Sequence, residues 1–192
     1  MNRIKNAAKI TLLALGLASF QGQALLKSDT LEPAEKHAKE SQLVVSLISN
    51  LHYKESQLND EMSKKILEKY ISILDPNKMY FMSEDILAFD TWQDQMDDFI
   101  KEGRLKPAYD IFNLFKKRMQ SRIDFALALL DEEMNFEADE IYHWDREKAE
   151  WPMDEKSLDT VWRQKVKNDY LSLQLVDKEP AKIKEILEKR YK

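Results

Sequence analysis

Histidine, carboxylate and serine side chains are the groups in this sequence that could do acid–base, metal or nucleophilic chemistry. The three histidines, at positions 37, 52 and 143, do not form the His-Glu-x-x-His pattern of a helical zinc site. His143, Asp145 and Glu147 alternate along one short stretch and could offer metal ligands from a loop. A surface loop in which Arg146 pairs with a carboxylate explains the same residues without a metal. We favour this second interpretation and predict no metal site.

No catalytic set can be argued from the other polar residues. The acidic run 131–133 stands where the solvated end of a helix is expected, and nothing marks two of its carboxylates as a buried acid–base pair. No Gly-x-Ser-x-Gly elbow occurs, and the absence of cysteine removes thiolate nucleophiles, disulfides and Cys-zinc sites. We therefore predict no catalytic, metal or cofactor-binding residue and no cofactor. A hydrolase built on His143 is the weakest of the hypotheses.

The first 24 residues have the three parts of a secretory signal peptide. Three basic residues precede an apolar run at positions 10–20, which is too short to span a bilayer. Gly22 and Ala24 then stand at the −3 and −1 positions of a cut after Ala24. The alternative is an N-terminal core helix. No later segment is long and apolar enough to span a membrane, so we expect a soluble mature chain in the periplasm.

The charge of the chain argues against a nucleic-acid partner. The 192 residues are 43% hydrophobic and 34% charged, with a formal net charge of −5. Residues 1–24 hold three of the 30 basic residues and none of the 35 acidic ones, so the mature chain carries −8. An acidic surface with scattered lysines and arginines repels phosphate backbones.

Apolar residues recur at helical spacing along the chain, in segments separated by five prolines. Apart from two glycines in the first 24 residues, Gly103 is the only glycine, which disfavours a β-rich fold. We predict an all-α fold, an irregular bundle of about six helices with one long ordered loop at about 135–153. The predicted helices cover about 33–52, 60–74, 83–102, 106–131, 155–175 and 181–191. The face predicted to be buried on the first of these helices consists of Leu43, Leu47, Ile48 and Leu51.

The connection between the second and third predicted helices is unusually apolar. Asp75, Pro76 and Asn77 are typical of a helix stop, and Ser83 is typical of an N-cap. Between them, residues 79–81 read Met-Tyr-Phe. We expect these three side chains to pack back across both helices rather than to bind a ligand.

The predicted loop at 135–153 is rich in aromatic residues that no helical period explains. They are Phe136, Tyr142, Trp144 and Trp151. Two interpretations stay open: the loop folds back as a plug over the helices, or it meets a partner surface. For the second interpretation we single out Tyr142, Trp144 and Trp151 as possible partner or interdomain contacts.

Several stretches of the chain resemble the N-terminal region of the tail-specific (carboxy-terminal processing) serine proteases of the bacterial periplasm. Residues 74–81 (LDPNKMYF) and 108–118 (AYDIFNLFKKR) carry part of the resemblance. Residues 144–152 (WDREKAEWP), followed by 158–173 (LDTVWRQKVKNDYLSL), are the most specific part. The order and spacing of these blocks match over about residues 40–191.

The resemblance implies a non-catalytic helical domain. In the family, such a domain follows a signal peptide and precedes a PDZ domain, a protease domain with a Ser–Lys dyad, and a C-terminal helical region. The enzyme cuts exported proteins after recognising an apolar C-terminal tail, and its helical domains wall the protease and help to admit or hold substrate. No residue here matches a catalytic position, because the dyad corresponds to sequence beyond residue 192.

Two hypotheses for the whole chain follow. In both, residues 1–24 are a signal peptide and residues 25–192 are a helical domain. In the first, the chain is the N-terminal domain of such a protease; its partners are the PDZ and protease part, protein substrates or a periplasmic adaptor protein. In the second, it is a stand-alone periplasmic module that binds a protein and has no protease role. Whether the chain is a gene fragment or a product in its own right stays open at this point.

Overall fold

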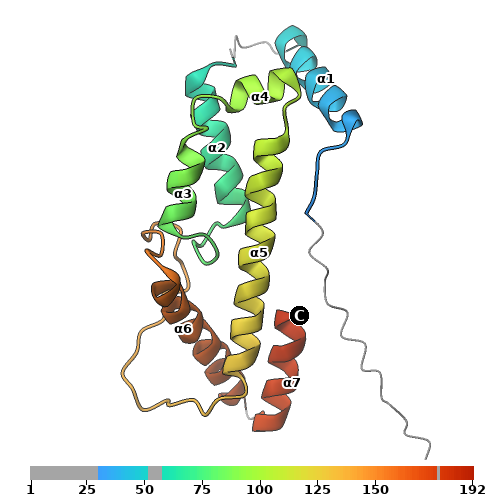
Figure 1. The fold of residues 1–192 in the computed structure, drawn as a ribbon. Coiled ribbons are helices and arrows are strands. Elements are labelled where there is room, and N and C mark those ends of the chain that lie inside the picture. Colours follow the sequence, from blue (N-terminus) through green and yellow to red (C-terminus); the bar gives the residue numbers. More distant parts are fainter. Residues whose placement is uncertain (1–29, 52–57, 177) are drawn as a thin grey trace, which may run out of the picture.

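The all-α prediction is confirmed by the computed structural model, which describes residues 30–51, 58–176 and 178–192. That part of the chain contains seven helices and no strand (Figure 1). The helices are α1 (Glu35–Leu51), α2 (Asp60–Leu74), α3 (Ser83–Asp90), α4 (Met96–Glu102), α5 (Lys106–Leu129), α6 (Glu155–Gln174) and α7 (Pro180–Tyr191). Ala24 and the predicted signal peptide lie outside the described residues.

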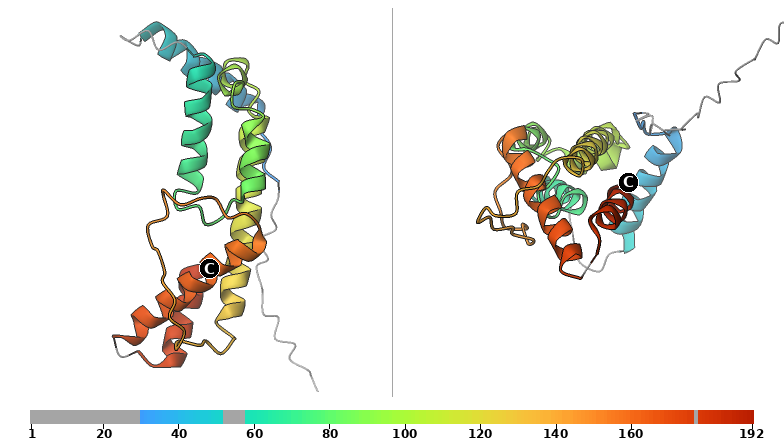
Figure 2. Two further views of the ribbon diagram at one scale, coloured as in Figure 1. Left: turned by 90° about the vertical axis from the view of Figure 1, so that its left-hand side faces the viewer. Right: turned by 90° about the horizontal axis from the view of Figure 1, so that it is seen from below.

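The long helix α5 is the axis of the molecule. Its 24 residues span about 36 Å at 1.5 Å per residue. In Figures 1 and 2, α2, α3 and α4 lie beside its first half, and α6 and α7 lie beside its second half. The molecule is therefore elongated, with one group of helices at each end of α5.

Each half has its own cluster of buried side chains, named here by its place in Figure 1. The upper cluster consists of Leu67, Ile71, Phe81, Phe89, Met96, Phe99 and Ile111. The lower cluster consists of Met79, Met82, Ala126, Leu129, Leu130, Leu158, Trp162, Val166, Ile183, Leu187 and Tyr191. Both clusters take residues from α5 and from the connection between α2 and α3.

The helix predicted at 83–102 is two helices, α3 and α4, so the described chain has seven helices where about six were expected. In one continuous helix the Met96 N–H would donate to the carbonyl of Trp92. It donates instead to the buried Ser63 hydroxyl of α2, at 2.6 Å. Residues 91–95 form turns, in which the Trp92 N–H donates to the Phe89 carbonyl at 2.9 Å. The helix is thus broken by a contact with α2, which could not be predicted from the local sequence.

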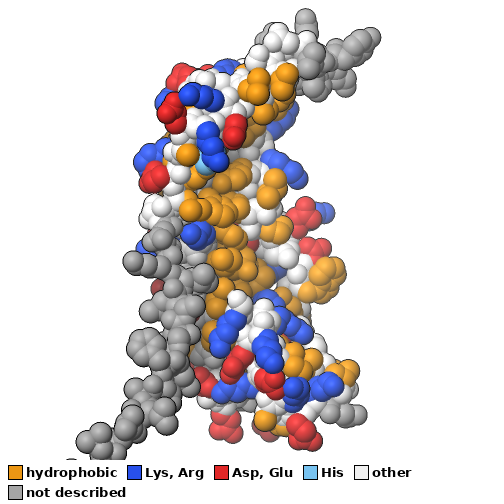
Figure 3. Space-filling model, turned by 90° about the vertical axis from the view of Figure 1, so that its right-hand side faces the viewer, with side chains coloured by type: hydrophobic (Ala, Val, Ile, Leu, Met, Phe, Trp, Pro, Cys, Tyr) orange, Lys and Arg blue, Asp and Glu red, His pale blue; other side chains and the backbone are white. Residues whose placement is uncertain are grey.

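The predicted buried face of α1 is solvent-exposed. Leu43 is 60% exposed, Leu47 48% and Ile48 39%, while the Leu51 side chain lies outside the description. The helix is held to α4 by another edge, where the Ser41 hydroxyl donates to the Ile100 carbonyl at 2.8 Å. Figure 3 shows hydrophobic side chains gathered near α1 and in a band below it.

Gly103 ends α4, as its type and position predicted. It adopts the left-handed conformation, with φ of 72°, that favours glycine at a helix C-terminus. A Cβ at this position would lie 2.9 Å from the Ala38 Cβ of α1. The same glycine therefore ends one helix and lets another approach closely.

Candidate functional site

The connection between α2 and α3 is organised by one buried carboxylate. Asp75 is 1% exposed, and its Oδ1 accepts the Met79 N–H at 2.7 Å. Its Oδ2 accepts the N–H groups of Tyr80 at 2.8 Å and Phe81 at 2.9 Å. These bonds fold residues 75–81 into a tight loop, which the positive φ of Lys78 (51°) helps to close.

Burial raises the pKa of Asp75, because desolvation penalises its charged form. The three backbone N–H donors and the charge of Arg146 act in the opposite direction and lower it. Arg146 makes no ion pair within 4.0 Å among the described residues, and its Nε is buried without a hydrogen-bond partner. The predicted ion pair between Arg146 and a carboxylate of its own loop is thus not present among the described residues.

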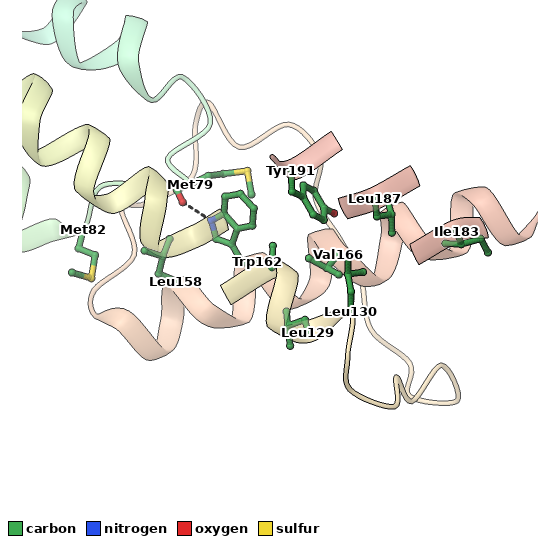
Figure 4. Close-up of a cluster of buried hydrophobic side chains, with 11 residues drawn as sticks. Met79, Met82, Leu129, Leu130, Leu158, Trp162, Val166, Ile183, Leu187 and Tyr191 are labelled. Atoms are coloured by element: carbon green, nitrogen blue, oxygen red, sulfur yellow. Dashed lines mark hydrogen bonds between the residues drawn. The ribbon is translucent and has the colours of Figure 1, made fainter. Parts of the chain in front are cut away.

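The apolar residues of this connection join the two clusters. The side chain of Phe81 is fully buried in the upper cluster, whereas those of Met79 and Met82 lie in the lower one. The Trp162 indole N–H of α6 donates to the Met79 carbonyl at 2.6 Å (Figure 4). The expectation that these residues pack across neighbouring helices is confirmed, and they also tie α6 to the upper half.

The loop at 135–153 is irregular over its whole length, as predicted, and its last part docks on the same connection. The Ser83 N–H donates to the Pro152 carbonyl at 2.9 Å. Ser83 is the first residue of α3 rather than its N-cap, and its hydroxyl donates to the Trp151 carbonyl at 3.2 Å. The Lys78 ammonium donates to the Ala149 carbonyl and lies 5.3 Å from the centre of the Trp151 ring.

The three aromatic residues singled out for partner contact have different environments. Trp151 is partly buried and packs on the upper cluster, with its ring centre 6.4 Å from that of Phe81. Tyr142 is partly buried as well, and its burial, together with the charge of Asp169, raises the pKa of the phenol. Trp144 is 77% exposed. The loop therefore packs against the upper cluster through Trp151 and leaves Trp144 exposed to solvent.

Trp144 has an exposed apolar neighbour in the sequence. Ile141 is 68% exposed, so two large apolar side chains three positions apart face solvent. Lys167 of α6 anchors this part of the loop through Glu140, at 2.8 Å, and the Phe136 ring stacks on Tyr170 with 5.4 Å between centres. Trp144 and Ile141 are thus exposed on a loop that other residues anchor to α6.

The groups that could have done chemistry do not form a metal-binding cluster among the described residues. His143, Asp145 and Glu147 are all exposed. Among the described residues, no group of three or more His, Cys, Asp or Glu side chains could hold a metal ion. In the same part of the chain, no helix is long and apolar enough to cross a lipid bilayer.

Comparison with known proteins identifies the family of this chain. The profile of the tail-specific protease N-terminal domain matches residues 44–192. This chain belongs to that family. It is also 36% identical over 197 residues to the tail-specific protease of Haemophilus influenzae. That match covers 97% of this chain but 28% of the relative's length.

The resemblance stated from the sequence is confirmed by these matches. The two most specific blocks, 144–152 and 158–173, hold residues that build the tail-specific protease N-terminal domain. Trp151 packs on the upper cluster and Trp162 in the lower one. Each of these two blocks therefore contributes a tryptophan to one of the two clusters.

Proposed function

We propose that this chain is a non-catalytic helical wall of a periplasmic tail-specific protease and that it helps to admit or hold protein substrates. The observation that carries the proposal is the match to 28% of a tail-specific protease by nearly the whole of this chain. The described residues contribute a helical body with two buried clusters and with exposed apolar side chains, among them Trp144 and Leu47. Such side chains suit contact with a larger assembly.

A chimera tests this role. Residues 25–192 of this chain would replace the matching region of the Haemophilus influenzae protease. We expect the chimera to cleave a reporter protein that ends in an apolar tail, and to spare the same reporter with a polar tail. The protease with the matching region deleted should be inactive. A chimera with native helix content that fails to cleave the reporter would contradict the proposal.

Trp144→Ala in the chimera tests the loop as an interdomain or substrate contact. An interface tryptophan commonly contributes more than about 1.4 kcal/mol, which predicts about a tenfold loss of cleavage rate. Leu175→Ala is the matched control, since Leu175 is also a large apolar residue and is 84% exposed. Equal rates for the two variants would remove Trp144 from the contact.

The same exposed Trp144 favours the second candidate, a stand-alone periplasmic module that binds an adaptor or another protein. The two candidates differ in what the Trp144 surface meets. Capture of a discrete periplasmic partner by this chain, lost in Trp144→Ala, together with an inactive chimera, would select the stand-alone module.

Export to the periplasm is part of both candidates and rests on the signal-like features of residues 1–24. We expect the exported protein to begin at Leu25, after a cut following Ala24. Mass spectrometry of the protein recovered from the periplasm measures its N-terminus. A product that retains Met1 would contradict the proposal.

A further inference from the structure

A cleft of about 380 Å³ opens between α2 and α3, next to the loops that carry Lys78 and Trp151. Its volume lies within the roughly 300–1,000 Å³ usual for ligand sites. The cleft is lined by residues between positions 64 and 93 and by Glu147 and Trp151 of the distant 135–153 loop, so no local sequence pattern indicated it. The two helices that line it, α2 and α3, lie in the upper half of the molecule in Figure 1.

The inner surface of the cleft is apolar and held in place by the upper cluster. Leu67 and Ile71 of α2 line it and are 2% and 7% exposed. Ile86 of α3 and Trp151 line it as partly buried side chains. Because these four residues pack in or against the upper cluster, the surface is preformed rather than induced.

Among the described residues that line the cleft, exposed carboxylates without an ion pair outnumber the one cation without such a pair, Lys78. Lys64 pairs with Asp94 at 3.2 Å, and the Lys78 ammonium donates to the Ala149 carbonyl. The carboxylates of Glu68, Asp90 and Glu147 also line the cleft. These three residues are exposed and have no ion pair within 4.0 Å in the part of the chain that the structure describes. A bound segment would therefore meet apolar side chains flanked by free acids.

We propose that the α2–α3 cleft binds a short polypeptide segment that carries large apolar side chains flanked by lysine or arginine. The apolar part of the segment would cover Leu67, Ile71 and Trp151, and its basic side chains would neutralise the rim. Charge complementarity selects this occupant, because an acidic segment would be repelled by the same three carboxylates. The proposal concerns this chain alone and does not depend on the protease role.

Binding of a defined peptide to the full chain tests the proposal. The probe is a fluorescent hexapeptide of alternating leucine and arginine with blocked ends, and glutamate replaces arginine in the matched peptide. We expect saturable binding of the first peptide, weakened by added salt, and at least about tenfold weaker binding of the second. Amide chemical-shift changes should be confined to α2, α3 and the loops next to them.

Charge reversal at the rim gives the decisive comparison. Glu68→Lys with Asp90→Lys should raise the dissociation constant of the leucine–arginine peptide at least about tenfold. Glu133→Lys with Glu137→Lys makes the same change in net charge at exposed sites beyond the end of α5, and should leave binding unchanged. An equal loss in both double variants, equal binding of both peptides, or no saturable binding would each overturn the proposal. Unchanged thermal unfolding would establish that the variants are folded.

Discussion

Replacing Phe81 with alanine is expected to lower the free energy of unfolding by about 3–5 kcal/mol, as for other fully buried phenylalanines. The Phe81 side chain has no exposed surface. Its ring centre lies 5.3 Å from that of Phe89, 5.8 Å from that of Phe115 and 6.4 Å from that of Trp151. Alanine would leave a cavity among three aromatic rings that come from α3, α5 and the long loop. Surrounding side chains cannot fill it, because each is held by its own element.

Urea unfolding followed by circular dichroism measures this loss. Leu87→Ala on α3 is the matched control, since Leu87 is 69% exposed and a surface change of this kind usually stays within about 0.5 kcal/mol. A loss below about 1 kcal/mol for Phe81→Ala would mean that the side chain is not enclosed in solution. The connection between α2 and α3 would then again be a candidate for partner contact.

Replacing Asp75 with alanine is expected to cost about 3 kcal/mol or more. The change removes the acceptor of three backbone N–H groups, those of Met79, Tyr80 and Phe81. A buried donor left without a partner costs about 1–3 kcal/mol, and water can satisfy some of the three only if the loop opens. Opening the loop would displace Met79 and Phe81 from their separate clusters. The loss should therefore reach both halves of the molecule.

Asp75→Asn separates hydrogen bonding from charge. Asparagine keeps the size and one acceptor oxygen, but its amide nitrogen cannot accept the remaining N–H groups. Since burial already penalises the charge of Asp75, losing that charge should offset part of the cost, and the expected loss is smaller than for alanine. Thermal unfolding of both variants, with exposed Asn77→Ala as control, measures the order. Equal losses for alanine and asparagine would contradict the hydrogen-bonding explanation.

In the aromatic loop at 135–153, some features of the candidate site were predictable from the sequence and others were not. Its irregular course and its value as a family signature were predictable from residues 135–153. Which of its tryptophans faces inward was not predictable, since a loop without a period gives side chains no repeating direction. The Ser83 N–H donates to the Pro152 carbonyl and the Lys78 ammonium donates to the Ala149 carbonyl, and these two bonds hold the segment in which Trp151 packs against Phe81. Trp144, seven residues earlier, is left in solvent.

Some helix boundaries were also predictable from local sequence, whereas others were not. Gly103 ended α4 as its type predicted, because only a left-handed residue closes the helix there. The break before Met96 was missed, because its cause is the Ser63 hydroxyl on another helix. The exposed face of α1 was missed for a related reason. Apolar spacing shows that a face is amphipathic, but not whether a partner helix covers it.

The sequence by itself determined the all-α class, most helix positions and membership of the tail-specific protease N-terminal domain family. These follow from periodicity, proline and glycine punctuation, and motif order, all of which are local in the chain. Only the tertiary structure decided that Met79 and Phe81 enter different clusters, that Trp144 is exposed, and that α2 and α3 enclose a cleft with an acidic rim. Each of these depends on contacts between segments tens of residues apart, whose pairing is set by the packing of the whole chain rather than by any local pattern.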